Sequence, residues 1–148
     1  MNELTKTLAH IDIESHPNFV RLHQEAGFDW LQEKDVENFL IHDGLKMAVF
    51  ADDPNARKET MDIVVIAPEL KKAFAGTLTK TVFAHPQTAR AIASRWGLRS
   101  MPAVALFRDQ DFLGAVQGLQ TWNDYCQKLA EIVQQKQSAP RIIALKSE

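Results

Sequence analysis

The chain has 148 residues, a length typical of a single domain that can bury an adequate hydrophobic core. Hydrophobic residues make up 45% of it and charged residues 24%, as in ordinary soluble globular proteins. The 17 Lys and Arg residues and 19 Asp and Glu residues give a net charge of −2, which argues against nucleic acid as a partner.

The first part of the chain alternates helical and strand patterns. Pro17 suits the first turn of a helix, where its missing N–H would be unpaired anyway, and Gly27 is a natural stop for that helix. Residues 28–31 predict a short edge strand, and residues 34–40 have helical spacing. The apolar run of residues 45–51 predicts a central buried strand.

The segment after this strand is the most ambiguous. Residues 52–60 are polar and predict a loop. The β-branched run of residues 63–66 favours a strand by itself, whereas the residues around it favour a helix. We therefore predict one helix over residues 62–75, with Asp62 as its N-cap and a bend near Pro68.

Further strands and helices follow in alternation. Residues 78–84 predict a strand, and His85 begins a helix whose apolar stripe ends at Gly97. Residues 103–107 and 112–116 predict two strands of an antiparallel hairpin.

Thr121 is expected to cap a last helix, which Pro140 is expected to break, leaving residues 137–148 as a tail. The resulting order is α-β-α-β-α-β-α-β-β-α, which predicts an α/β protein with a mixed sheet between two helical layers. We expect one domain over residues 1–148, with its core at about residues 16–136.

Few residues suggest a catalytic site or a site for a metal or cofactor. The single cysteine, Cys126, lies on the apolar stripe of the last helix and is interpreted as an inert core residue. The five histidines lack metal-ligand spacing, and the chain has no glycine-rich phosphate loop or nucleophile elbow, so no metal or cofactor is expected. The paired acids Asp52-Asp53 and Asp109/Asp111 are interpreted as solvated, so no enzyme activity is expected.

The chain also lacks signals for membranes and export. No apolar run approaches the ~20 residues that a bilayer span needs, and the first residues do not have the charged and hydrophobic regions of a signal peptide. One cysteine allows no disulfide within the chain. These observations predict a cytoplasmic protein that does not insert into a membrane.

Residues 96–107 read Trp-Gly-Leu-Arg-Ser-Met-Pro-Ala-Val-Ala-Leu-Phe: a helix end, a short loop and the start of a buried strand. This segment resembles the centre of a thioredoxin domain, and the resemblance extends over about residues 45–135. Other positions that carry it are Phe50, Pro68 and Gly118. The resemblance implies a thioredoxin-like three-layer α/β/α sandwich, in which the bond between Met101 and Pro102 is cis and lines a groove for an extended peptide.

The chain departs from thioredoxins at residues 52–61, where the dithiol motif is replaced by a polar loop without cysteine. Dithiol exchange needs an attacking and a resolving thiol, which one cysteine cannot supply. A cis proline could still let the backbone of Met101 pair with an extended peptide. Alternatively, Pro102 only shapes the turn into the strand.

A narrower resemblance, over nearly the whole chain, is to the hydrogenase expression proteins of the HyaE/HupG family. The segments that carry it are Ala26-Gly27-Phe28, Asp43-Gly44, Asp52-Asp53-Pro54, Arg95-Trp96-Gly97, Met101-Pro102-Ala103 and Gly118-Leu119-Gln120-Thr121-Trp122. The resemblance implies a cytoplasmic accessory protein for uptake NiFe hydrogenases. Such proteins are held to chaperone the precursor of the small subunit by binding its twin-arginine signal peptide, and other accessory proteins are possible partners.

The thioredoxin-like fold would place an acidic lip beside the groove at Met101 and Pro102. Its members are Asp52, Asp53, Glu59 and Asp62, whose carboxylates could pair with guanidinium groups. Arg57 and Lys58 share the loop and could neutralise this lip. The apolar groove would then have to contribute most of the affinity.

Two other functions remain open at this point. The chain could be a thiol–disulfide oxidoreductase that uses Cys126 with an external thiol. It could also be a redox-inactive structural module that holds a partner through its sheet edge or through residues 141–148.

Overall fold

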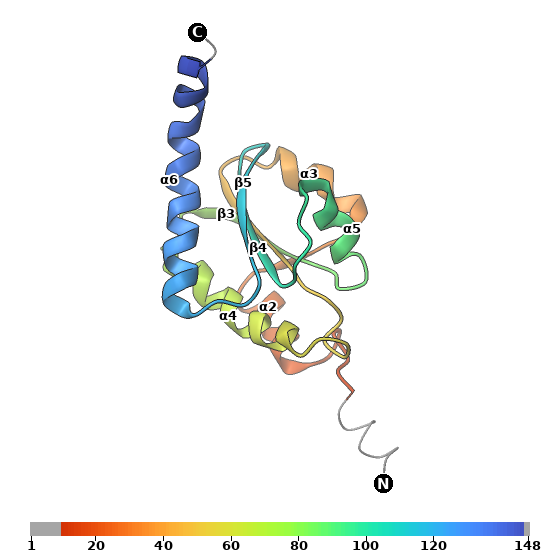
Figure 1. Ribbon diagram of the computed structural model, residues 1–148. Coiled ribbons are helices and arrows are strands. Elements are labelled where there is room, and N and C mark those ends of the chain that lie inside the picture. Colours follow the sequence, from red (N-terminus) through yellow and green to blue (C-terminus); the bar gives the residue numbers. More distant parts are fainter. Residues whose placement is uncertain (1–9, 147–148) are drawn as a thin grey trace.

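A computed structural model describes the backbone of residues 10–146 and the side chains of residues 10–135. It contains one five-stranded sheet in the order β1-β3-β2-β4-β5 (Figure 1). Strands β1, β3 and β2 are parallel, whereas β4 runs antiparallel to β2 and β5 antiparallel to β4. The strands are β1 (Asp29–Leu31), β2 (Leu45–Phe50), β3 (Leu78–Ala84), β4 (Ala103–Arg108) and β5 (Asp111–Gln117). The mixed sheet is as predicted.

Helices cover both faces of this sheet. On one face, α2 (Pro17–Gln24), α4 (Glu59–Ala73) and α6 (Trp122–Lys146) contribute to one hydrophobic cluster. On the other, α3 (Val36–Ile41) and α5 (Ala89–Ala93) contribute to a second cluster, and the short turns η1 (Glu33–Asp35) and η2 (Ser94–Trp96) adjoin them. The chain therefore has the three-layer, thioredoxin-like α/β/α fold that the sequence predicted (Figure 1).

Strand β2 is the centre of both clusters. Its six residues are all buried, because helices pack on both faces and strands pair on both sides. Met47 and Val49 point into one cluster, and Ala48 and Phe50 point into the other, as the alternation of a strand requires. The prediction of a central buried strand is confirmed.

Helix α4 begins earlier than predicted. It starts at Glu59, so Asp62 is an exposed residue of its first turn and not its N-cap. The hydroxyl of Thr60 donates to the backbone carbonyl of Asp52 at 2.8 Å and ties the helix start to the end of β2. Asp62 still interacts favourably with the positive end of the helix dipole. The helix continues through Pro68, as predicted.

Helix α5 is shorter than the predicted helix. His85 begins a turn, and regular helix starts only at Ala89. The imidazole Nδ1 of His85 accepts the backbone N–H of Gln87 at 3.2 Å, which favours that turn. Gly97 ends the segment in a left-handed conformation with φ of 73°, as its sequence position predicts.

The last helix begins as predicted but ends later. The hydroxyl of Thr121 accepts the backbone N–H of Asp124 at 3.1 Å, which confirms the cap. The break expected at Pro140 is wrong, because the backbone is helical through Lys146. A proline removes one intrahelical hydrogen bond, and a long helix can continue past it with a local adjustment.

Lys46 is a fully buried cation within β2. Its ammonium donates hydrogen bonds to the backbone carbonyls of Phe39 and Leu40, the latter at 2.9 Å, and lies 4.7 Å from the centroid of the Phe39 ring. These carbonyls belong to the C-terminal end of α3, where a positive charge is favourable. Burial lowers the pKa of Lys46, and the charges of Asp109 and Asp43 partly offset this effect.

We expect Lys46→Met to lower the free energy of unfolding by about 1–3 kcal/mol, because the backbone carbonyls of Phe39 and Leu40 each lose the hydrogen bond from the ammonium. The folded protein binds the Lys46 proton more weakly than the unfolded chain does. The stability of the wild type should therefore rise relative to Lys46→Met as the pH increases from the lowered pKa towards the ordinary value of 10.5. Urea unfolding across this alkaline range measures both effects. Lys80→Met, which removes a partly exposed ion pair with Asp29, is the control and should cost below about 1 kcal/mol.

Candidate functional site

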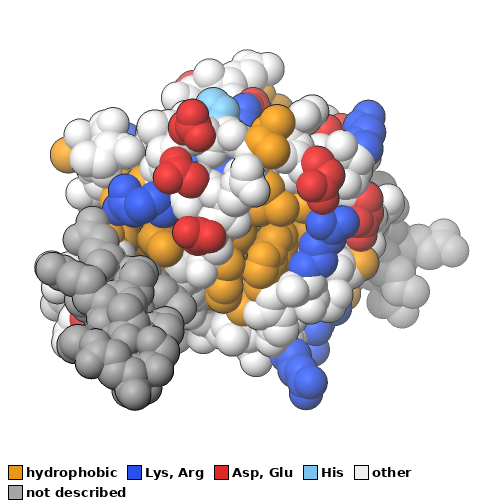
Figure 2. Space-filling view, turned by 90° about the horizontal axis from the view of Figure 1, so that it is seen from above, with side chains coloured by type: hydrophobic (Ala, Val, Ile, Leu, Met, Phe, Trp, Pro, Cys, Tyr) orange, Lys and Arg blue, Asp and Glu red, His pale blue; other side chains and the backbone are white. Residues whose placement is uncertain are grey.

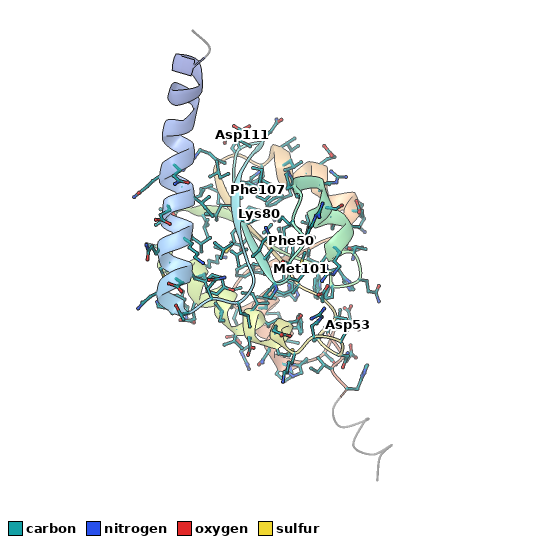
Figure 3. All side chains as sticks on the ribbon, viewed as in Figure 1. Phe50, Asp53, Lys80, Met101, Phe107 and Asp111 are labelled. Carbon is teal, nitrogen blue, oxygen red and sulfur yellow. The ribbon has the colours of Figure 1, made fainter. Side chains whose placement is uncertain are left out.

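The peptide bond between Met101 and Pro102 is cis, as the thioredoxin resemblance implied. It lies at the end of the sheet where β2 finishes and β4 begins; Figure 3 shows Met101 and Asp53 towards this end and Asp111 at the opposite one. Pro102 is buried and Met101 is partly exposed. Among the described residues, neither the backbone N–H nor the C=O of Met101 has a hydrogen-bond partner. The structure therefore leaves a free backbone donor and acceptor beside the cis proline.

The end of β5 holds the loop that leads to this proline. The side-chain oxygen of Gln117 accepts the backbone N–H groups of Arg99 at 2.9 Å and Ser100 at 3.0 Å. The backbone N–H of Gly118 donates to the carbonyl of Pro102 at 2.8 Å. Three hydrogen bonds from two adjacent residues thus fix the loop, so the free groups of Met101 are held in one orientation.

Arg90 joins this loop to the loop after β2. Its guanidinium forms a fork with the carboxylate of Asp52, with Nε–Oδ1 at 2.7 Å and Nη2–Oδ2 at 2.9 Å, and its third nitrogen donates to the carbonyl of Arg99 at 3.0 Å. The hydrogen bond and the charge of Asp52 raise the pKa of Arg90. The polar loop that replaces the thioredoxin dithiol is therefore fastened to the cis-proline loop by an ion pair.

The four acids predicted to form a lip are in different situations. Asp52 is already paired with Arg90. The carboxylate of Asp53 accepts the backbone N–H of Asn55 at 3.0 Å and stabilises the turn that follows β2. Glu59 is partly buried and Asp62 exposed, both in the first turn of α4, and among the described residues neither has an ion-pair partner. The structure records no contact of these acids with Met101 or Pro102.

Two large apolar residues at this end of the molecule were not among the predicted site residues. Leu119 follows Gly118, the residue bonded to Pro102, and is 36% exposed. Trp122 is 46% exposed, because it is the first residue of α6 and the buried face of that helix begins at Tyr125. The sequence carried a signal for them, because both are large apolar residues close to the helix cap Thr121.

Cys126 is less buried than predicted. It is partly exposed, while its neighbour Tyr125 and Leu129, one turn further on, occupy the core. The prediction that Cys126 is buried in the core is therefore wrong. A single thiol still has no resolving partner within the chain.

Between residues 10 and 135, no group of three His, Cys, Asp or Glu side chains is placed to hold a metal ion. None of the helices in residues 10–146 combines the length and the apolar character of a membrane span.

We expect Arg90→Gln to lower the free energy of unfolding by only about 0.5–1 kcal/mol, because the guanidinium is half exposed. The larger effect should be local: the loops that the Arg90 side chain joins should exchange their amide hydrogens faster. Hydrogen exchange of Ser100 and of residues 52–58 measures it. Arg95→Gln removes longer contacts to Glu33 and Glu37 and is the control, which should leave these amides unchanged.

Comparison with known proteins places the chain in a family. The family model described as "Hydrogenase-1 expression protein HyaE" matches residues 19–125. The hydrogenase expression/formation protein HoxO of Azotobacter vinelandii is 28% identical over 134 residues, covering 90% of this chain and 89% of that protein. HupG of Rhodobacter capsulatus, which has the same description, is 28% identical over 124 residues, covering 83% and 89%.

A crystal structure of HupG from Rhodopseudomonas palustris CGA009 is similar in fold. Its TM-score is 0.50 at 24% identity, and the similarity covers 74% of this chain and 97% of that one. Because the family model spans most of the fold described above, the chain belongs to the HyaE family of hydrogenase expression proteins.

Proposed function

We propose that this chain is a non-catalytic chaperone that binds the twin-arginine signal peptide of the small-subunit precursor of an uptake NiFe hydrogenase in the cytoplasm. Its family and relatives support the coarser statement that it acts in hydrogenase maturation. Other hydrogenase accessory proteins are possible additional partners. The groove beside the cis proline is the proposed binding site.

The observation that carries the proposal is the free backbone of Met101 next to the cis proline. An extended peptide can pair with this N–H and C=O as an added strand. Leu119 and Trp122 offer apolar contacts near the same loop, and tryptophan is prominent among residues that dominate binding energy. This surface is thus suited to an extended segment with apolar side chains, such as the hydrophobic region of a signal peptide.

Charge makes a smaller contribution to the proposed site. Asp53, Glu59 and Asp62 could receive arginine side chains, whereas Asp52 is engaged by Arg90. Exposed ion pairs are each worth about 0–1 kcal/mol. The apolar and backbone contacts would therefore supply most of the affinity, with the acids favouring a cationic segment.

The absence of a dithiol supports binding without catalysis. Reduction of a disulfide by this fold needs one thiolate that attacks and a second that resolves the mixed disulfide. Here the loop after β2 contains no cysteine, and its Asp52 pairs with Arg90. We expect Cys126→Ser to leave partner binding unchanged.

The test is co-purification with a small-subunit precursor, made with and without its signal peptide. We expect capture of the complete precursor and at least ~10-fold weaker capture of the truncated form. Trp122→Gln should weaken capture about tenfold, because it removes an exposed aromatic contact without disturbing the core.

Val65→Gln is the matched control, since Val65 is 53% exposed in a separate hollow between α2 and α4. It should bind like the wild type. Equal capture of the precursor without its signal peptide would overturn the proposal. Loss of binding in Cys126→Ser would instead favour a thiol-dependent activity.

A further inference from the structure

A hollow of about 590 Å³ lies at the end of the sheet opposite cis Pro102. It is lined by the starts of β2 and β3, the last residue of β4, the C-terminal end of α4 and the middle of α6. The register of β2 and β4 places Leu45 and Arg108 at this end and Ala103 at the other, so the hollow is separate from the proposed groove. Sites for small molecules in proteins typically have volumes of ~300–1,000 Å³.

The walls of this hollow are largely apolar. Leu45 is buried at its base, and Phe74 of the α4 end and Val133 of α6 are partly buried beside it, all in the hydrophobic cluster that α4 and α6 share. Ala130, one turn before Val133, is exposed at its edge. Figure 2 looks onto this end of the molecule and shows hydrophobic side chains exposed between charged ones. The hollow therefore offers an apolar surface to a ligand.

The hydroxyl groups that line the hollow already donate hydrogen bonds within the protein. The hydroxyl of Thr79 donates to the carbonyl of Asp43 at 2.7 Å. The hydroxyl and the backbone N–H of Thr77 donate to the carbonyl of Phe74 at 2.7 and 3.0 Å. These two bonds occupy a carbonyl at the end of α4 that would otherwise present a negative partial charge to the hollow.

Arg108 alone is charged among the described residues that line the hollow. Val104 and Leu106 of β4 belong to the cluster of α4 and α6, and the alternation of the strand turns Arg108 to the same face. Its side chain is partly buried, and its Nε is inaccessible to solvent and has no hydrogen-bond partner among the described residues. A buried N–H without a partner is unfavourable, so this nitrogen is suited to accept a ligand.

The carboxylates nearby do not pair with this guanidinium. Asp109 accepts the backbone N–H of Gly44 at 2.8 Å, and Glu131 lines a different hollow beside β5. Asp111 is the partner of Arg108 in the register of the β4–β5 hairpin, so both side chains lie on the same face. It is exposed, and within the described part of the chain the two form no ion pair. The guanidinium is therefore available to an anion in the hollow.

We propose that the hollow binds a small aliphatic carboxylate, a molecule with one carboxylate group on an apolar tail. The tail would lie against Phe74 and Val133, and the carboxylate would form a fork with Nε and a terminal nitrogen of Arg108. Arg90 forms such a fork with Asp52 at the other end of the sheet. A turn of the Arg108 guanidinium towards the hollow would give its Nε the partner that it lacks.

The charge of the hollow favours this class of ligand over others. One guanidinium matches the single charge of a carboxylate, whereas a phosphate dianion would keep an uncompensated charge. An aliphatic alcohol would gain the apolar contacts without the charge-assisted hydrogen bonds. The proposal does not depend on the groove beside Pro102, because the two surfaces lie at opposite ends of the sheet (Figure 3).

The test uses the complete chain labelled with nitrogen-15, with octanoate as the probe and 1-octanol as its uncharged match. We expect octanoate to shift the amide signals of residues 44–45, 74–79 and 130–134 and the side-chain Nε–H signal of Arg108. 1-Octanol should bind about tenfold more weakly, because it cannot form charge-assisted hydrogen bonds. Hexanoate should bind about fivefold more weakly than octanoate, because it buries two fewer methylene groups.

Matched variants separate recognition of the carboxylate from general effects of charge. Arg108→Met should weaken octanoate binding about tenfold and leave 1-octanol binding unchanged, which also shows that the variant is folded. Arg108→Lys keeps the charge without the fork and should weaken octanoate binding about threefold. Arg21→Met is the control, because Arg21 is exposed beside the separate hollow between α2 and α4, and it should bind octanoate like the wild type.

Asp111→Asn should have the opposite effect. Asp111 lies on the same face as Arg108, so its charge repels the carboxylate of the ligand. Its removal should tighten octanoate binding about twofold, as expected for an exposed charge. Octanoate titrations of the variant and the wild type at the same ionic strength measure this effect.

Several results would overturn the proposal. An absence of shifts, shifts confined to residues 101–102 and 118–122, or equal binding of octanoate and 1-octanol would show that the hollow does not recognise a carboxylate. Equal weakening by Arg108→Met and Arg21→Met would do the same. Tighter binding of a short apolar peptide through its free C-terminal carboxylate would overturn the choice of a small molecule. Arg108→Met should leave capture of the hydrogenase precursor unchanged, so the two proposals can fail separately.

Discussion

Strand β2 is covered on both faces and paired along both edges. Its register therefore determines which residues meet at each end of the sheet. Pairing with β4 places Phe50 opposite Ala103, so Asp52 lies next to the loop of Pro102. The same pairing places Leu45 opposite Arg108, so Gly44 and Asp109 exchange hydrogen bonds at the other end. A one-residue slip of this strand would turn its apolar residues to the wrong faces and disrupt both ends.

At the end of the sheet near Pro102, an ion pair lies where thioredoxins have their dithiol. The loop after β2 is joined to the cis-proline loop through the guanidinium of Arg90, which bonds Asp52 and the carbonyl of Arg99. This contact is directional but exposed, so it orients the loops while adding little to the overall stability. The free backbone of Met101 is consequently presented by a loop that is held from two directions.

Local patterns predicted the strands, their order along the chain and the three layers, because apolar alternation and turn residues act over a few positions. Helix ends were less predictable: Asp62 is a good N-cap by type, but the contact of Thr60 with Asp52 starts α4 earlier. The proposed acidic lip changed because Arg90 lies 38 positions from Asp52, a separation that no sequence spacing encodes.

The three tryptophans of the chain lie in three separate environments. Trp122 is exposed at the start of α6, and Trp96 stacks on Phe112 of β5. Trp30 lies between the imidazoles of His23 and His85, with centroids 4.1 and 5.0 Å away. Variants that keep one indole at a time would therefore turn intrinsic fluorescence into a separate optical reporter for the start of α6, for the β5 side of the sheet and for the surroundings of β1.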